Sequence, residues 1–91
     1  MSGLALPAEL TQAEASACLR ALVTHLKSES APAVVVNATA LVRFDSSALA
    51  VLLELRREAL AIGKTFAVQG LSTRLQNLAV LYGISDLMPV A

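Results

Sequence analysis

The sequence predicts a single small α/β domain with a mostly parallel central sheet and helices packed on it. Helix-like and strand-like segments alternate along the chain, so each helix can return the chain to a neighbouring parallel strand by a right-handed crossover. Residues 33–36 form a short, uninterrupted, β-branched run, which is typical of a strand covered on both faces. A chain of 91 residues has room for one core, so we expect residues 1–91 to form one domain.

The first half of the chain predicts a strand, a helix and a second strand. Residues 4–10 are apolar but contain Pro7, which favours a weak strand at the edge or end of a sheet. Thr11 and Glu14 have the spacing of a capping box, so a helix is expected to begin at Thr11 and to end near Ser28. After a turn, residues 33–36 form the next strand. The apolar positions of this helix recur every three to four residues and comprise Ala15, Cys18, Leu19, Leu22, Val23 and Leu26.

The second half predicts two further helices with a strand between them. Residues 46–62 have helical spacing, Gly63 suits the left-handed position that ends a helix, and residues 65–69 form a strand. The third helix is capped by Ser72 or Thr73 and stops at Gly83. The tail, residues 84–90, fits either a last short turn or a strand. The stripes expected to face the core are Ala48, Val51, Leu52, Leu55, Ala59 and Ile62, then Leu71, Leu75, Leu78, Ala79 and Tyr82.

Both of these helices carry more apolar surface than one sheet contact ordinarily needs. The additional apolar positions are Leu49, Leu53 and Leu60 on the second helix, with Arg56 among them, and Val80 and Leu81 on the third. Either another helix of the same domain or a partner protein could cover them, and the usual packing of adjacent helices on one sheet face favours the first alternative. The composition, 56% hydrophobic and 15% charged, makes a partner surface a fair expectation and leaves a weak homo-oligomer open.

Composition and motifs exclude several classes of function. Seven basic residues balance seven acidic ones without a basic cluster among the aromatics, so nucleic acid is not expected as a partner. No run approaches the roughly 20 apolar residues of a membrane span and no secretory signal is evident, so we expect a cytoplasmic protein without direct membrane insertion. Cys18 is expected to be a packed thiol and His25 a surface residue. One Cys and one His form no familiar metal site, no phosphate loop is present, and neither a cofactor nor enzymatic activity is expected.

The most informative motif is Asp45-Ser46-Ser47, which lies where a loop enters the longest apolar helix. In open α/β sheets, functional groups gather in loops that leave the carboxyl ends of strands, and this loop has that position. The two hydroxyls behind a carboxylate can cap the helix, accept a phosphate or contact a partner. Catalysis has little support, because Ser46 has no general base near it in the sequence.

One stretch of the chain, together with its flanking segments, resembles the STAS domain. The stretch is Val42-Arg43-Phe44-Asp45-Ser46-Ser47-Ala48-Leu49-Ala50-Val51-Leu52-Leu53; Val34-Val35-Val36 precedes it, and Gly63-Lys64 and a strand follow it. STAS domains occur in anti-sigma-factor antagonists, in sulfate transporters and in the accessory subunit of a bacterial lipid transporter. The ending Leu81-Tyr82-Gly83-Ile84 and the short N-terminus are most similar to the MlaB branch, the cytoplasmic STAS subunits of the Mla phospholipid ABC transporter. The chain departs from the common antagonist pattern at Ala48, where Gly is usual, and at Asn37, where an acidic residue is frequent.

The resemblance implies two functions centred on Ser46. In the Mla branch the matching hydroxyl is tied to docking on the ATPase of a phospholipid-transporting ABC complex, which predicts a regulatory subunit held at the inner membrane through its partner. In the antagonists the hydroxyl after the aspartate is where a switch kinase places a phosphate, which predicts an anti-sigma-factor antagonist. We expect the partner surface to comprise Ser46 with Asp45, Ser47, Leu49, Leu53, Arg56, Val80 and Leu81.

Overall fold

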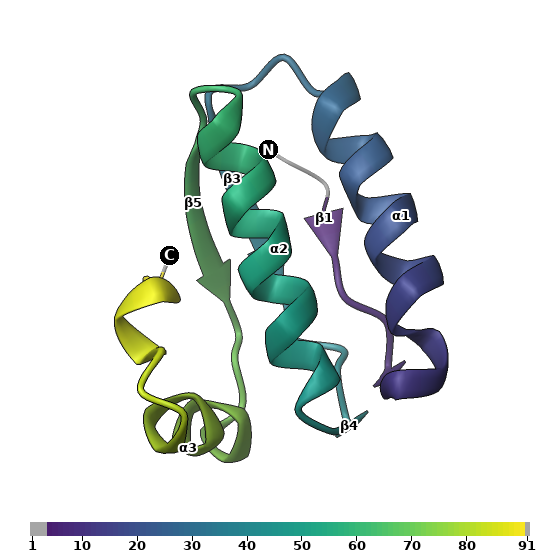
Figure 1. The fold of residues 1–91 in the computed structure, drawn as a ribbon, viewed down its shortest axis with the longest axis vertical. Coiled ribbons are helices and arrows are strands. Elements are labelled where there is room, and N and C mark those ends of the chain that lie inside the picture. The colour runs from purple at the N-terminus through teal and green to yellow at the C-terminus, as the bar shows by residue number, and fades with distance from the viewer. Residues whose placement is uncertain (1–3, 91) are drawn as a thin grey trace.

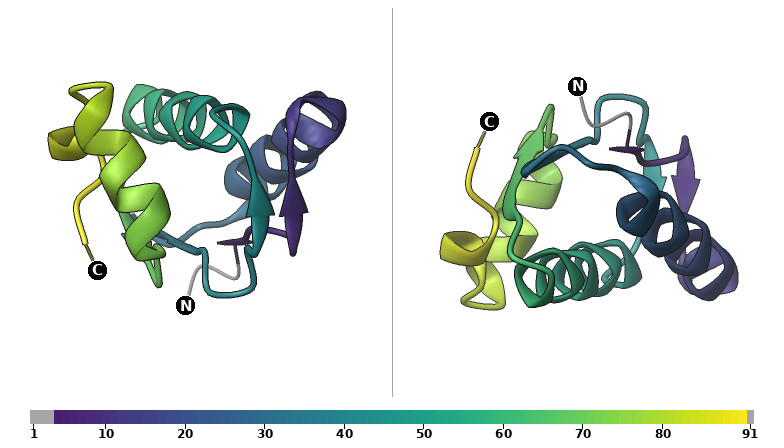
Figure 2. Two further views of the ribbon diagram at one scale, coloured as in Figure 1. Left: turned by 90° about the horizontal axis from the view of Figure 1, so that it is seen from below. Right: turned by 90° about the horizontal axis from the view of Figure 1, so that it is seen from above.

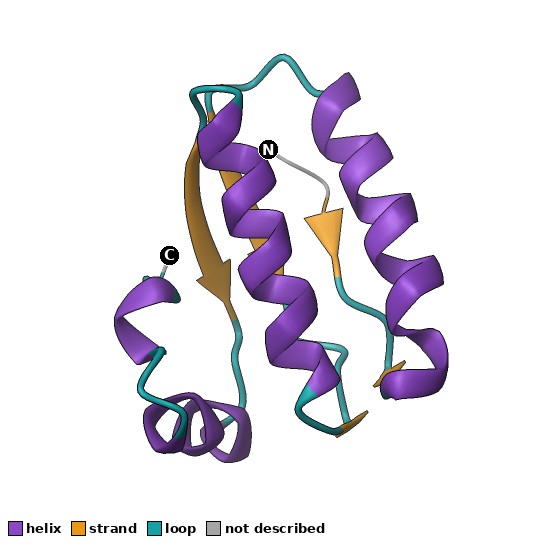
Figure 3. Ribbon diagram, viewed as in Figure 1, coloured by secondary structure: helices purple, strands orange, loops and turns teal. Residues whose placement is uncertain are grey.

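A three-stranded parallel sheet with the order β1-β3-β5 forms the centre of the fold (Figures 1 and 3). The structure is a computed structural model and describes residues 4–90. The strands are β1 (Leu4–Ala5), β3 (Ala33–Asn37) and β5 (Thr65–Gln69), and all their pairings are parallel. The predicted α/β class with a parallel sheet is therefore confirmed.

Two helices lie side by side over one face of this sheet, and the third lies near the end at which β5 finishes (Figures 1 and 2). They are α1 (Gln12–Ser28), α2 (Ser47–Ala61) and α3 (Thr73–Leu81). The start of α2 and the whole of α3 are thereby brought to the same end of the molecule, which is where the Asp45 motif lies (Figure 1).

The helix ends follow the local signals in the sequence. The Thr11 backbone N–H donates to Glu14 Oε1 at 3.1 Å, so the predicted capping box is present at the start of α1. The Leu75 N–H donates to Ser72 Oγ at 3.2 Å, which identifies Ser72 rather than Thr73 as the cap of α3. Gly63 has φ +77° just after α2, the left-handed conformation that favours glycine.

The N-terminal segment differs from the single strand expected over residues 4–10. It divides on either side of Pro7, which has no N–H to donate to a ladder, and the second part joins another sheet. This two-stranded parallel sheet pairs β2 (Glu9–Leu10) with β4 (Arg43–Phe44). The β4 strand leads directly into the Asp45 motif.

The tail forms the short turn that was one of the two predicted alternatives, and a single β-bridge in place of a strand. A short 3₁₀ helix, η1 (Ser85–Leu87), comes first. The Val68 N–H then donates to the Pro89 carbonyl at 2.8 Å, and Val90 forms a single parallel bridge with Val68. Met88, which lies between η1 and Val90 in the sequence, has a buried side chain, so the tail packs against the core.

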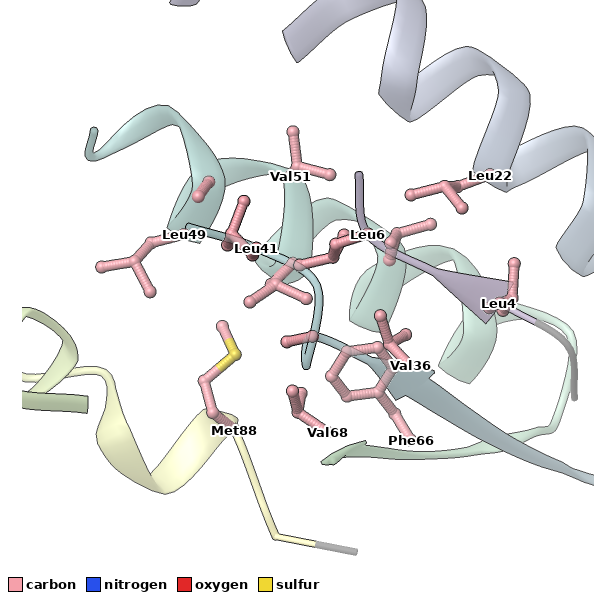
Figure 4. Close-up of a cluster of buried hydrophobic side chains, with 14 of the residues drawn as sticks. Leu4, Leu6, Leu22, Val36, Leu41, Leu49, Val51, Phe66, Val68 and Met88 are labelled. Carbon is pink, nitrogen blue, oxygen red and sulfur yellow. The ribbon is translucent and has the colours of Figure 1, made fainter. Parts of the chain in front are cut away.

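The core lies between the sheet and the two covering helices, and Figure 4 shows part of it. Its largest fully buried side chains are Leu4, Leu10, Leu26, Val36, Leu52, Leu55, Val68 and Leu75. Two predicted core residues are exposed instead, Ile62 at 46% and Tyr82 at 56%. Both occupy the position directly after a helix, where no further turn of that helix follows to carry the apolar stripe on.

Cys18 and His25 lie in the environments that the sequence predicted. Cys18 is half-buried, and burial raises the pKa of its thiol, so this side chain is a packed thiol as predicted. His25 lies on the surface of α1, where its Nε2 is 3.3 Å from Glu29 Oε2.

Candidate functional site

Asp45 joins the N-termini of two helices. Its Oδ1 accepts a hydrogen bond from the Ser47 backbone N–H at 2.8 Å, and its Oδ2 accepts one from the Gln12 backbone N–H at 3.1 Å. Gln12 and Ser47 are the first residues of α1 and α2, whose N–H groups have no partner inside their own helices. The Ser47 bond is the largest cause that holds the pKa of Asp45 below its usual range, and the Gln12 bond acts in the same direction.

Ser46 does not cap the helix, so capping, one of the three roles that the sequence left open for the hydroxyls of this motif, does not apply to Ser46. It occupies the N-cap position of α2, but its backbone is already helical at φ −62° and ψ −17°, and its side chain makes no cap hydrogen bond. Its backbone carbonyl instead accepts hydrogen bonds from the N–H groups of Leu49 and Ala50. The exposed Ser46 hydroxyl has no hydrogen-bond partner within residues 4–90, because Asp45 performs the capping.

A surface depression of about 420 Å³ opens beside this hydroxyl. One side comes from the β4–α2 junction and the other from α3, so the two walls are far apart in the sequence. Its lining consists of Phe44, Asp45, Ser46, Arg74, Asn77, Leu78 and Tyr82. The sequence placed Asp45 and Ser46 at a functional edge of the sheet but did not indicate the residues that face them from α3.

Arg74 is the charged residue on the α3 side of the depression. Its guanidinium carbon lies 5.1 Å from the centroid of the Phe44 ring, which is the geometry of a cation–π contact. The residues are 30 positions apart, and an exposed Arg in the first turn of a helix carries no local signal of such a contact. Sequence reasoning therefore missed Arg74 and Phe44.

The structure contradicts one predicted partner contact, Leu49. Its side chain is 2% exposed and lies among the buried residues of the core, near Leu41 (Figure 4). The domain itself covers this position, as the alternative interpretation of the apolar row proposed. Leu53 and Arg56, further along α2, are half-buried, and Leu53 packs against the core.

Val80 and Leu81 are both exposed, at 62% and 77%, but they lie on different sides of α3. Leu81 follows Asn77 and Leu78 by four and three residues, so it neighbours the depression on the helix surface. Val80 instead lines a smaller hollow of about 140 Å³ that also includes Met88. The predicted partner residues thus do not form one continuous surface around Ser46.

The two departures from the antagonist pattern have structural roles. Ala48 is completely buried, so its methyl group faces the core and not a partner. Asn37 Oδ1 accepts a hydrogen bond from the Thr39 backbone N–H at 2.9 Å and another from the Thr39 hydroxyl. Asn37 therefore shapes the loop after β3.

Among residues 4–90, no three or more His, Cys, Asp or Glu side chains lie close enough together to hold a metal ion. No helix in the same range is long and apolar enough to cross a membrane.

Comparisons with known proteins agree with this architecture. The chain is similar to the structure of an anti-sigma-factor antagonist (STAS) domain protein from Planctomyces limnophilus, with a TM-score of 0.80 and 14% sequence identity. The similarity covers 99% of this chain and 83% of the other, and at this identity it establishes the fold alone. No curated protein matches the chain. A family model described as "Mlab, STAS domain" matches residues 2–89, and the chain therefore belongs to this STAS domain family.

Proposed function

We propose that this STAS domain is a non-enzymatic regulatory subunit that binds the ATPase of a phospholipid-transporting ABC complex and docks through Ser46. The observation that carries the proposal is the exposed Ser46 hydroxyl, which has no partner among the described residues although it stands at a helix start. A hydroxyl that is not needed for capping and that opens onto a depression is available for a contact from outside.

The family assignment and the exposed apolar side chains support a protein partner. The family model carries the Mlab description, and the sequence resembles the STAS subunits of Mla transporters. Leu81 and Tyr82 are large, exposed and close to the depression, which is how the apolar part of a docking surface is commonly built. The proposed location is the cytoplasmic face of the inner membrane, reached through the ATPase.

The proposed mechanism is allosteric. A subunit that does no chemistry can activate an ATPase only by binding its active arrangement more tightly than the alternative. Couplings of this kind commonly correspond to affinity ratios of about 5 to 150. If ATP also binds the active arrangement more tightly, ATP and this domain should each raise the affinity of the ATPase for the other, since such coupling is reciprocal.

A single substitution tests the docking role of Ser46. Ser46→Glu places a charged, longer side chain at the contact while Asp45 retains both caps, so the domain should stay folded and the affinity for the ATPase should fall. Ser16→Glu, at an exposed position on α1, is the matched control and should bind as the wild type does. Affinity is measured by calorimetry and by co-purification, with the melting temperature as the test of folding. Unchanged co-purification of the Ser46→Glu variant would refute the proposal.

The second candidate function is a phospho-switched anti-sigma-factor antagonist. The same exposed hydroxyl favours it, because a phosphate on Ser46 would lie at the N-terminus of α2, where the helix dipole stabilises negative charge. The fold would accept the phosphate while an interface would not. A kinase-dependent mass gain of one phosphate on Ser46, without association with any transporter subunit, would favour this function over the first.

A further inference from the structure

We infer that Arg74 is the electrostatic anchor of the docking surface and that the ATPase supplies a carboxylate side chain to it. This inference rests on the proposed function and adds the chemistry of the partner contact. It is carried by the charge and hydrogen-bonding groups of the depression between the β4–α2 junction and α3.

Arg74 is an exposed cation without an acidic partner in the described part of the chain. The ion pairs among residues 4–90 are His25–Glu29, Lys27–Glu58, Arg43–Glu9 and Arg57–Glu54. Asp45 lines the same depression, but its two oxygens already accept the backbone N–H groups of Gln12 and Ser47. The Asp45 carboxylate therefore stabilises the two helix starts and forms no ion pair with Arg74.

The guanidinium also has one contact inside the domain that favours its orientation toward the depression. Its contact with the Phe44 ring, at 5.1 Å to the centroid, orients a side chain that would otherwise lose much rotational freedom on binding. A preorganised guanidinium presents parallel N–H donors, which match the two oxygens of a carboxylate. Arg74 is thus suited to a directional contact and not only to a general attraction.

The neighbouring groups indicate the same kind of ligand. Ser46, Asn77 and Tyr82 can each donate a hydrogen bond, and their side chains make none within residues 4–90. Phe44 and Leu78 add apolar surface to the same lining. An acceptor with an apolar flank satisfies this arrangement, so the fitting occupant is a partner Glu or Asp that has an apolar residue beside it.

The inference is tested with three variants and the isolated ATPase. Arg74→Gln removes the charge and should raise the Kd by about tenfold or more, because a partly desolvated carboxylate would lose its partner. Arg74→Lys keeps the charge without the planar fork and should have an intermediate affinity. Arg20→Gln removes a charge from another exposed position, on α1, and is the matched control, with an expected change below about twofold. The melting temperature of each variant shows whether it is folded.

Salt dependence and charge reversal identify the partner group. Raising the salt concentration should weaken the wild type more than Arg74→Gln, because screening acts on the charge that the variant lacks. Arg74→Glu should abolish binding, and a Lys substitution at one acidic residue on the contact surface of the ATPase should restore it. Restoration would identify the carboxylate that Arg74 binds.

Each outcome separates the inference from the proposed function. If Ser46→Glu weakens docking while Arg74→Gln and Arg74→Glu bind as tightly as the wild type, the anchor role of Arg74 is wrong and the proposed function stands. If no Lys substitution in the ATPase rescues Arg74→Glu, the carboxylate assignment is wrong. If the wild type does not bind the ATPase at all, the proposed function fails, and the inference fails with it.

Discussion

Leu49→Ala should destabilise the domain strongly, because the structure places this leucine in the core and not at a partner surface. Its side chain is 2% exposed, so the substitution removes three buried carbon groups, which costs about 2.4 kcal/mol at about 0.8 kcal/mol each. The cavity that remains raises the expected loss of unfolding free energy to about 3 kcal/mol. In a domain of this size that loss corresponds to a fall in melting temperature of about 12 to 24 °C.

Leu81→Ala is the matched control, because it makes the same chemical change on another helix. Leu81 is 77% exposed, so burial contributes only about a quarter as much there and the expected loss is about 0.5 kcal/mol. Urea unfolding followed by circular dichroism measures both losses, and an unchanged m-value shows that the same unfolding transition is compared.

The effects of the two substitutions on binding to the ATPase should have the reverse order, with the larger effect for Leu81→Ala. Leu81→Ala should weaken docking while the domain remains stable, whereas Leu49→Ala should bind normally at temperatures at which it is still folded. Equal losses of stability in the two variants, or a loss below about 1 kcal/mol for Leu49→Ala, would refute the placement of Leu49 in the core.

Two further predictions concern the backbone around the site. Gly70 has φ +74°, and a Cβ built on it would lie 2.5 Å from Thr39 Oγ1. Gly63 has a similar φ of +77°, but a Cβ there would have no atom within 4 Å. Gly70→Ala should therefore lower the unfolding free energy more than Gly63→Ala does. Equal losses in urea unfolding would contradict this steric reason. Because the folded pKa of Asp45 is lowered, its carboxylate stabilises the fold fully above its unfolded pKa of about 3.9, and that contribution is lost as the pH falls through the folded value. The stability difference between wild type and Asp45→Asn should therefore shrink below about pH 4, and a constant difference from pH 7 to pH 2.5 would show that the charge is not responsible.

The features that the sequence predicted correctly depend on neighbours within a few residues. The Thr11–Glu14 box, the Ser72 cap and Gly63 act within one helical turn, and the structure has each of them. The alternation of helices and strands then limited the topology to a parallel sheet.

The features that the sequence did not predict depend on contacts between distant segments. Helical spacing put Leu49 and Leu53 in one row, but how deeply each is buried depends on what packs against α2. The contact between Phe44 and Arg74 likewise exists only because α3 returns to the start of α2. The Asp45 motif could be recognised locally, whereas the other wall of its depression could not.

The double cap at Asp45 has a consequence for how such a domain changes partners. Two helix starts need an acceptor with two oxygens at position 45, so selection for folding alone is expected to retain it. Folding does not require a hydroxyl at position 46, because the Ser46 side chain makes no cap hydrogen bond to the helix that it precedes. A duplicated copy of this gene can therefore alter Ser46 and the facing side of α3 to acquire a new partner while the scaffold beneath them stays the same.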